Sequence, residues 1–171
     1  MDVKDAILGR RSIRRYADKP IPDSAVASLI EAVRWAPSSG NLQARKFYFV
    51  FNNDTKTRLA VLALNQMFIA TAPLVVVACA DYEKIADYGN RGKTLYVIQD
   101  VACAAENLLL EAYELGLGSV WVGAFDASGV ANALNLPENL MPMAIIPVGY
   151  GAHHPKAPER EAKEAIVTIL R

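Results

Sequence analysis

Residues 74–80 read LVVVACA, a run in which every position is apolar or small. A strand with one face in water alternates apolar and polar side chains, whereas a strand covered on both faces is apolar throughout. The run is also far too short to cross a membrane. We therefore expect a buried inner strand in a sheet that is flanked by helices.

The rest of the chain alternates helical and extended patterns without an internal repeat or a linker, so residues 1–171 form one predicted domain. The connections differ in length, which favours an α+β sandwich with a mixed, mainly antiparallel sheet over a regular parallel one. Asp23 and Asp54 are the expected N-caps of two helices. Helices are predicted over 2–10, 23–36, 54–68, 95–115 and 130–134, and strands over 46–51, 74–80, 119–125, 144–149 and 165–170.

The formal net charge is zero, with 18 basic and 18 acidic residues, which argues against a nucleic-acid or polybasic membrane partner. The charges are unevenly distributed along the chain, because residues 1–46 carry a net charge of +4 and the remainder a net charge of −4. Arg10, Arg11, Arg14 and Arg15 lie within six positions. Guanidinium groups match phosphate oxygens, and Arg10 and Arg14 would share a face if a helix continued through them. The alternative is a solvated basic turn.

Two other segments have the composition of a ligand site. Residues 36–43 (APSSGNLQ) combine neutral hydrogen-bonding side chains, which suit the edge of a heteroaromatic ring, although Pro-Ser-Ser-Gly is also ordinary turn chemistry. Gly123 interrupts the strand pattern of residues 119–125, as glycine does at a bulge or beside a closely approaching ligand. Asn65 and Gln66 come late on a predicted helix and either contact a ligand or cap the helix.

The sequence gives little support for a dinucleotide-binding fold, a hydrolase triad, a metal site or a disulfide. The Gly-Leu-Gly of residues 116–118 precedes a strand, whereas a dinucleotide fingerprint follows one. His153 and His154 are adjacent and are the only histidines, which argues against a hydrolase triad or a metal site. Cys79 and Cys103 are expected to be buried free thiols of a cytoplasmic protein without a signal peptide.

Four ordered motifs resemble the nitroreductase family of flavin-dependent oxidoreductases. They are RRSIRRY at 10–16, APSSGNLQ at 36–43, GLGSVWVGAF at 116–125, and GYG at 149–151 followed by a Pro-containing tail with Arg160. Their order and spacing cover nearly the whole chain. The family's proline two residues after the late arginine is Ala162 here.

The resemblance implies a homodimer with an exchanged C-terminal segment and FMN bound at the interface. The high apolar fraction, 53% with only 21% charged residues, independently favours an oligomer. By the resemblance, one subunit provides the phosphate and ribityl ligands, the other lines the flavin ring, and residues 122–123 place backbone near its reactive nitrogen. Asn65 or Gln66 would meet the pyrimidine edge. The implied cofactor-binding residues are Arg10, Arg11, Ser12, Arg14, Pro37, Ser38, Ser39, Asn41, Asn65, Gln66, Val122, Gly123 and Arg160.

The expected activity is FMN-dependent reduction of nitro-aromatics, quinones or similar flat small-molecule acceptors, with NADH or NADPH as co-substrate and ping-pong kinetics. No catalytic side chain is assigned, because the cofactor carries the redox chemistry. Two alternatives remain: an FMN-binding or storage protein without turnover, and a dehalogenase-like enzyme of the same fold. The short polar stretch between Tyr82 and Thr94 argues against the large lid that such specialised enzymes carry.

Overall fold

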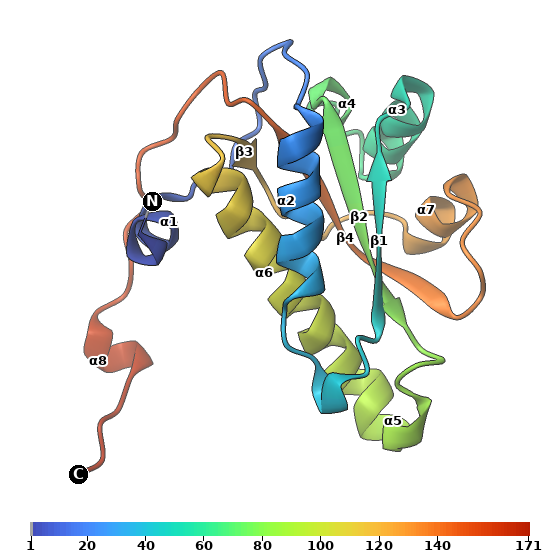
Figure 1. Cartoon of the computed structure of the whole chain (residues 1–171), viewed down its shortest axis with the longest axis vertical. Helices are drawn as coiled ribbons and strands as arrows, with labels where there is room; N and C mark the ends of the chain where they lie inside the picture. Colours follow the sequence, from blue (N-terminus) through green and yellow to red (C-terminus); the bar gives the residue numbers. More distant parts are fainter. Residues whose placement is uncertain (1) are drawn as a thin grey trace.

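A four-stranded antiparallel sheet forms the centre of the computed structural model, which describes residues 2–171 (Figure 1). Its order is β1 (Arg45–Val50), β2 (Leu74–Asp81), β4 (Leu140–Gly149) and β3 (Gly118–Ser119). β2 pairs with β4 along its whole length and with β1 over residues 75–80, and β1 lies at the edge of the sheet. The predicted mainly antiparallel sheet is therefore confirmed.

Helices cover both faces of the sheet, as the apolar β2 run predicts. The β2 side chains alternate between two cores: Val76 packs in the core with α2 (Asp23–Arg34) and α6 (Val97–Glu114), and Val77 packs in the core with α3 (Asn53–Leu62) and α7 (Ala127–Ala133). Every β2 residue is buried. The remaining elements are α1 (Val3–Gly9), η1 (Ser39–Asn41), α4 (Phe68–Thr71), η2 (Ala86–Tyr88), α5 (Gly89–Arg91), the π-helical turn η3 (Gly92–Tyr96) and α8 (Lys163–Ile166).

Both predicted N-caps are wrong by one or two residues. The cap of α3 is Asn52, whose side chain accepts a hydrogen bond from the Thr55 N–H at 2.9 Å, and Asp54 lies in the first turn. Asp23 is the first residue of α2 and makes no cap hydrogen bond. An acidic residue in a first turn still interacts favourably with the helix dipole. The predicted helix over 54–68 also ends early, because Leu64 and Asn65 have positive φ angles.

Two predicted strands are also corrected. In place of a strand over 119–125, β3 contains two residues and Val122 forms a single bridge with Ile145. In place of a strand over 165–170, Lys163–Ile166 is a helical turn. Val167 has extended backbone angles, but residues 167–171 pair with no strand in the described chain. A strand needs a neighbour to satisfy its backbone groups, and the tail has none within its own chain.

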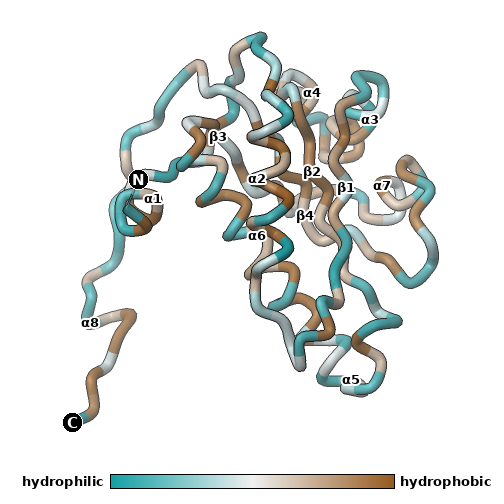
Figure 2. Tube along the Cα trace, in the orientation of Figure 1, coloured by the Kyte–Doolittle hydropathy of each residue, from teal (hydrophilic) through white to brown (hydrophobic). Residues whose placement is uncertain are grey.

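The C-terminal tail leaves the body of the protein and exposes apolar side chains. Figure 1 shows it running away from the sheet past α1, and Figure 2 shows that much of the segment between α8 and the C-terminus is hydrophobic. Ile166 is 66% exposed and Leu170 is 91% exposed. In residues 2–171 no helix has both the length and the hydropathy needed to cross a bilayer.

The two cysteines differ in environment, so the prediction of two buried thiols is wrong for one of them. Cys79 lies in β2 with no exposed surface, and burial raises the pKa of its thiol to about 12. Cys103 lies on the exposed side of α6.

In a Cys103→Ser variant, we expect the remaining Cys79 thiol to be inert toward a thiol reagent at pH 8 in the folded protein. The thiolate is the reactive form, and at that pH it is scarce and shielded by the core. Complete labelling should follow unfolding in guanidinium. Absorbance of the released chromophore measures the extent of labelling in the folded and in the unfolded protein. Stoichiometric labelling of the folded protein would contradict the burial of Cys79.

Candidate functional site

The arginine cluster and the C-terminal tail meet in an open concavity of about 260 Å³. α1 ends at Gly9, so Arg10 and Arg14 do not share a helical face as expected. Backbone pairing draws the tail to the cluster instead: the Ala17 N–H donates to the Tyr150 carbonyl at 2.8 Å, and the Ala152 N–H donates to the Arg15 carbonyl at 2.9 Å. The concavity is lined by Arg10, Arg11, Ser12, Arg14, Pro155, Lys156, Pro158 and Arg160.

The cationic side chains of this concavity are only partly neutralised by the protein itself. Arg10 Nε lies 3.8 Å from a Glu106 carboxylate oxygen on α6. Arg11 donates to the carbonyls of Leu8 and Arg10 at 2.8 and 2.7 Å, so it also caps the C-terminal end of α1. In the described chain, Arg14 makes no ion pair with an acid. Lys156 and Arg160 of the tail make no ion pair in the described chain either. The concavity therefore has positive charge available to bind an anion.

A second contact joins this cluster to the strand-like motif of residues 116–125. Ser12 and Ser119 form a parallel bridge, and the Ile13 N–H donates to the Ser119 carbonyl at 3.0 Å. Farther along, the Val122 N–H donates to the Ile145 carbonyl at 2.9 Å, so it is not available to a ligand as expected. The next residue, Gly123, is exposed and its N–H has no acceptor within residues 2–171.

The amides at the end of α3 lie beside the same motif. The Gln66 side-chain amide donates to the carbonyls of Ala63 and Ala124 at 2.8 and 3.3 Å, which places it next to Gly123. Asn65 is exposed, with a φ angle of 60°. Both amides therefore remain candidates for one ligand edge, with Gln66 already held in place by backbone.

The loop of residues 36–41 lies elsewhere. Figure 1 shows it between α2 and β1, beside α5, whereas α1 and the arginine cluster lie toward the other end of α6. The loop contacts Asp100 near the start of α6, and Gly9 packs against Tyr113 near its end. Thirteen residues of helix separate these contacts, which is about 20 Å at 1.5 Å per residue. A single chain therefore does not bring Pro37, Ser38, Ser39 and Asn41 to the concavity.

Three charged residues at or near these places were not singled out from the sequence. Lys156 lines the concavity, and its signal was a cation four positions before Arg160 in the same tail. Arg45 and Asp100 are 8% and 3% exposed and hold the 36–41 loop. Asp100 was recognisable as a lone acid on the otherwise apolar face of the predicted helix.

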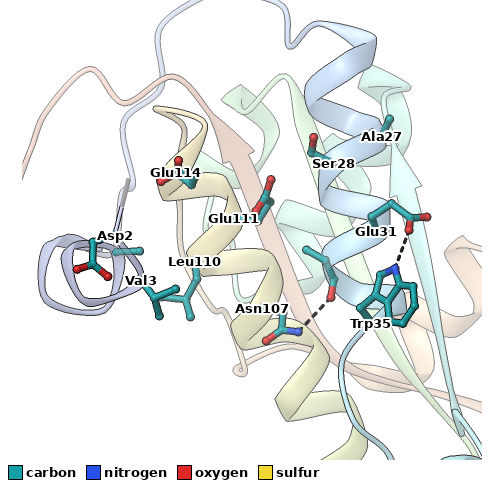
Figure 3. A pocket seen from close by; sticks show the side chains of 12 residues that line it. Asp2, Val3, Ala27, Ser28, Glu31, Trp35, Asn107, Leu110, Glu111 and Glu114 are labelled. Carbon is teal, nitrogen blue, oxygen red and sulfur yellow. Dashed lines mark hydrogen bonds between the residues drawn. The ribbon is translucent and has the colours of Figure 1, made fainter.

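A larger groove lies outside this cluster, between α1, α2 and α6 (Figure 3). Its volume is about 680 Å³ and its walls are mostly apolar. Val3 and Leu110 line one side, and Trp35, 75% exposed, lines the other with its indole N–H bonded to Glu31 at 2.9 Å. An exposed apolar surface of this kind is typical of a protein interface.

Comparison with known proteins assigns the chain to a family. The model of the nitroreductase family matches residues 7–69 and 59–150, which together contain the first three motifs and the first two residues of the GYG motif. The chain belongs to the nitroreductase family. Its resemblance in sequence is therefore confirmed, and so is the predicted nitroreductase-like fold.

Relatives of this nitroreductase have related activities in their names. An "NADH dehydrogenase" of Thermus thermophilus is 32% identical, covering 98% of this chain and 95% of the relative. An "FMN reductase [NAD(P)H]" of Bacillus subtilis is 28% identical over 96% of this chain and 72% of its own length. The structure of the NADPH:FMN oxidoreductase from Vibrio harveyi in complex with NAD+ superposes with a TM-score of 0.90 at 29% identity, covering 99% of this chain and 77% of that one. These relatives support the predicted enzyme class, an NAD(P)H-dependent flavin oxidoreductase that uses FMN.

Proposed function

We propose that this nitroreductase is a homodimeric, cytoplasmic enzyme that reduces nitro-aromatics, quinones or similar flat acceptors by a ping-pong mechanism. The observation that carries the proposal is the cationic concavity, which unites the first motif with Arg160 across nearly the whole chain. When bound, FMN would supply the redox chemistry, which is acceptance of a hydride from NADH or NADPH and reduction of the acceptor. The residues around it bind and orient it.

The donor set of the site fits FMN. Its phosphate is a dianion, and Arg14, Lys156 and Arg160 supply cations that no protein carboxylate neutralises in the described chain. Its isoalloxazine edge needs neutral donors and acceptors, which the exposed Gly123 N–H and the Gln66 amide provide. No acid–base pair lies among these residues. The protein's contribution to the reaction is therefore position and electrostatics.

The position of the 36–41 loop supports a site shared between two subunits. The loop lies at the opposite end of α6 from the concavity, so it cannot line a flavin held by its own chain's arginines. In a homodimer with antiparallel α6 helices, the loop of one subunit would reach the concavity of the other. Pro37, Ser38, Ser39 and Asn41 would then line the flavin ring of the partner's site.

The exposed tail and the sheet edge support exchange of the C-terminal segment. Among residues 2–171, β1 pairs with β2 alone, so the outer side of its backbone has no strand neighbour there. Residues 163–171 at the end of the tail have apolar side chains and extended angles at Val167, and all of them are exposed within the described chain. A tail that adds as a strand to the partner's β1 edge would provide hydrogen-bond partners for that edge and would bury the apolar side chains of the tail. The apolar groove of α1, α2 and α6 offers further surface for the same dimer.

The segment between β2 and α6 bears on the dehalogenase-like alternative. It consists of the short turns η2, α5 and η3, and no larger insertion stands over the flavin-binding motifs. A general NAD(P)H-dependent reductase with an open acceptor site fits this short connection better than an enzyme with a large lid.

The proposal is tested by the visible spectrum of the purified protein, followed by anaerobic titration with NADH and with NADPH. We expect an oxidised flavin spectrum with about one FMN per chain, bleaching on addition of one or both nicotinamides, and recovery when a quinone or nitro-aromatic acceptor is added. Parallel initial-rate lines over varied acceptor would support ping-pong kinetics. Flavin that stays oxidised under excess of both nicotinamides would support a storage protein, and failure to bind FMN would refute the proposal.

A further inference from the structure

The loop that carries Ser39 and Asn41 is held by one buried carboxylate. Asp100 lies on the first turn of α6 and is 3% exposed. Its Oδ1 accepts hydrogen bonds from both the main-chain N–H and the hydroxyl of Ser39, at 2.8 and 3.0 Å. Bonds to an ionised acceptor are about twice as strong as neutral ones, so this contact fixes Ser39 firmly against α6.

A buried arginine holds the start of the same loop. Arg45, at the beginning of β1, donates to the carbonyls of Ala36 and Pro37, and more weakly to the main-chain carbonyl of Asp100 at 3.4 Å. Burial lowers the pKa of Arg45, and the Asp100 carboxylate opposes that shift. The two charges therefore support each other while they bind adjacent parts of one loop.

The conformation of the loop needs this support. Gly40 and Asn41 have φ angles of 54° and 56°. These angles lie in the left-handed region, which glycine and asparagine adopt more readily than most other residues. The Tyr88 hydroxyl packs where a side chain on Gly40 would stand, so the loop is also confined from the side of η2. A free loop of this composition would populate many other conformations.

The free-energy cost of burying the Asp100 carboxylate indicates that this residue has a role other than stabilising the fold. Its Oδ2 is buried and has no hydrogen-bond partner in the described part of the chain. A buried carboxylate with incomplete hydrogen bonding contributes little net folding free energy, although its removal beside a buried cation such as Arg45 is destabilising. What the carboxylate does provide is a single geometry for Ser39.

We propose that Asp100 is a positioning residue that, together with Arg45, pre-organises the 36–41 loop for its contact with the flavin of the partner subunit. The proposal rests on the proposed function, because it assumes that this loop lines a flavin. Asp100 acts through Ser39 and does not itself contact the cofactor. Its removal should therefore lower cofactor affinity and change the asymmetry of the bound flavin in protein that remains folded.

The test compares FMN binding by the full-length dimer and by Asp100→Ala and Asp100→Asn variants. We expect Asp100→Ala to raise the Kd for FMN about 30-fold, because both bonds to Ser39 are lost. Asp100→Asn retains a neutral acceptor at nearly the same place and should raise Kd between about three- and tenfold. Quenching of FMN fluorescence gives Kd, and visible circular dichroism of the flavin should change in the same order.

The matched control is Asp81→Ala. Asp81 is a similarly buried carboxylate, bonded to the Asn139 side chain at 2.9 Å and to the N–H groups of Glu83 and Lys84, without a side-chain contact to the loop. Its removal should lower thermal stability and leave the Kd of the folded protein unchanged. A wild-type Kd in either Asp100 variant, or an equal loss in Asp81→Ala, would overturn the proposal. Should Asp100→Ala fail to fold, Asp100→Asn decides alone. Failure of the wild type to bind FMN would instead refute the proposed function.

Discussion

Replacing Arg14 and Arg160 together by alanine will weaken FMN binding about 100-fold or more. Both side chains line the concavity from segments that are far apart in the sequence. Neither forms an ion pair within the described chain, so their charges are available to the phosphate. Charge-assisted hydrogen bonds contribute about 1.5–3 kcal/mol each, and the lower end applies to exposed groups, so the pair loses about 3 kcal/mol. Titration of the apoprotein with FMN measures the effect.

Arg15→Ala is the matched control for this prediction. Arg15 is exposed like Arg14 and follows it directly, but it does not line the concavity. Its removal should change the Kd for FMN less than threefold at 0.15 M salt, where the Debye length of about 8 Å screens distant charges. An equal loss in Arg15→Ala would mean that the cluster acts through net charge alone. An unchanged Kd in the double variant would mean that the cluster is a solvated turn.

A chain that stops after Ala162 will be monomeric and will lose its FMN. This truncation removes α8 and the apolar end of the tail but keeps Lys156 and Arg160, so the phosphate ligands remain. Burying Ile166, Val167, Ile169 and Leu170, each at least 60% exposed in the single chain, would contribute about 6 kcal/mol per tail before ordering costs. The dimer exchanges two tails, so about 12 kcal/mol is lost, which corresponds before ordering costs to a rise of about 10⁹-fold in the dimer Kd. Analytical ultracentrifugation measures the mass of the particle, and its absorbance in the visible range measures the bound flavin.

Two point variants separate the apolar contribution from the length of the tail. Ile169→Asp should reproduce most of the loss of the dimer, because it buries a charge in the proposed contact. Glu164→Gln, in the exposed turn α8, should leave the dimer intact. A truncated chain that remains a flavin-loaded dimer would refute the exchange of the tail, while the shared flavin site could still be tested through Asp100.

Local patterns in the sequence were sufficient for the inner strand β2 and the helix α6, but not for the end of α3 or for the tail. The apolar β2 run and the α6 stripe depend on burial that recurs along each element, so periodicity reveals them. The early end of α3 was missed because it depends on the backbone angles of Leu64 and Asn65, and Leu64 is an unusual residue in the left-handed region. The predicted strand over 165–170 was wrong because the tail has no strand neighbour within the described chain.

The sequence by itself determined the buried sheet, the family, and most of the residues proposed to bind the flavin. Those conclusions follow from residue types and their order along the chain. Only the tertiary structure decided which of these residues meet: it joins Ser12 to Ser119 and Arg14 to Arg160, uses the Val122 N–H within the sheet, and sets the 36–41 loop at the far end of α6. Contacts between distant segments depend on how α6 and the sheet pack, and residue order does not specify that packing.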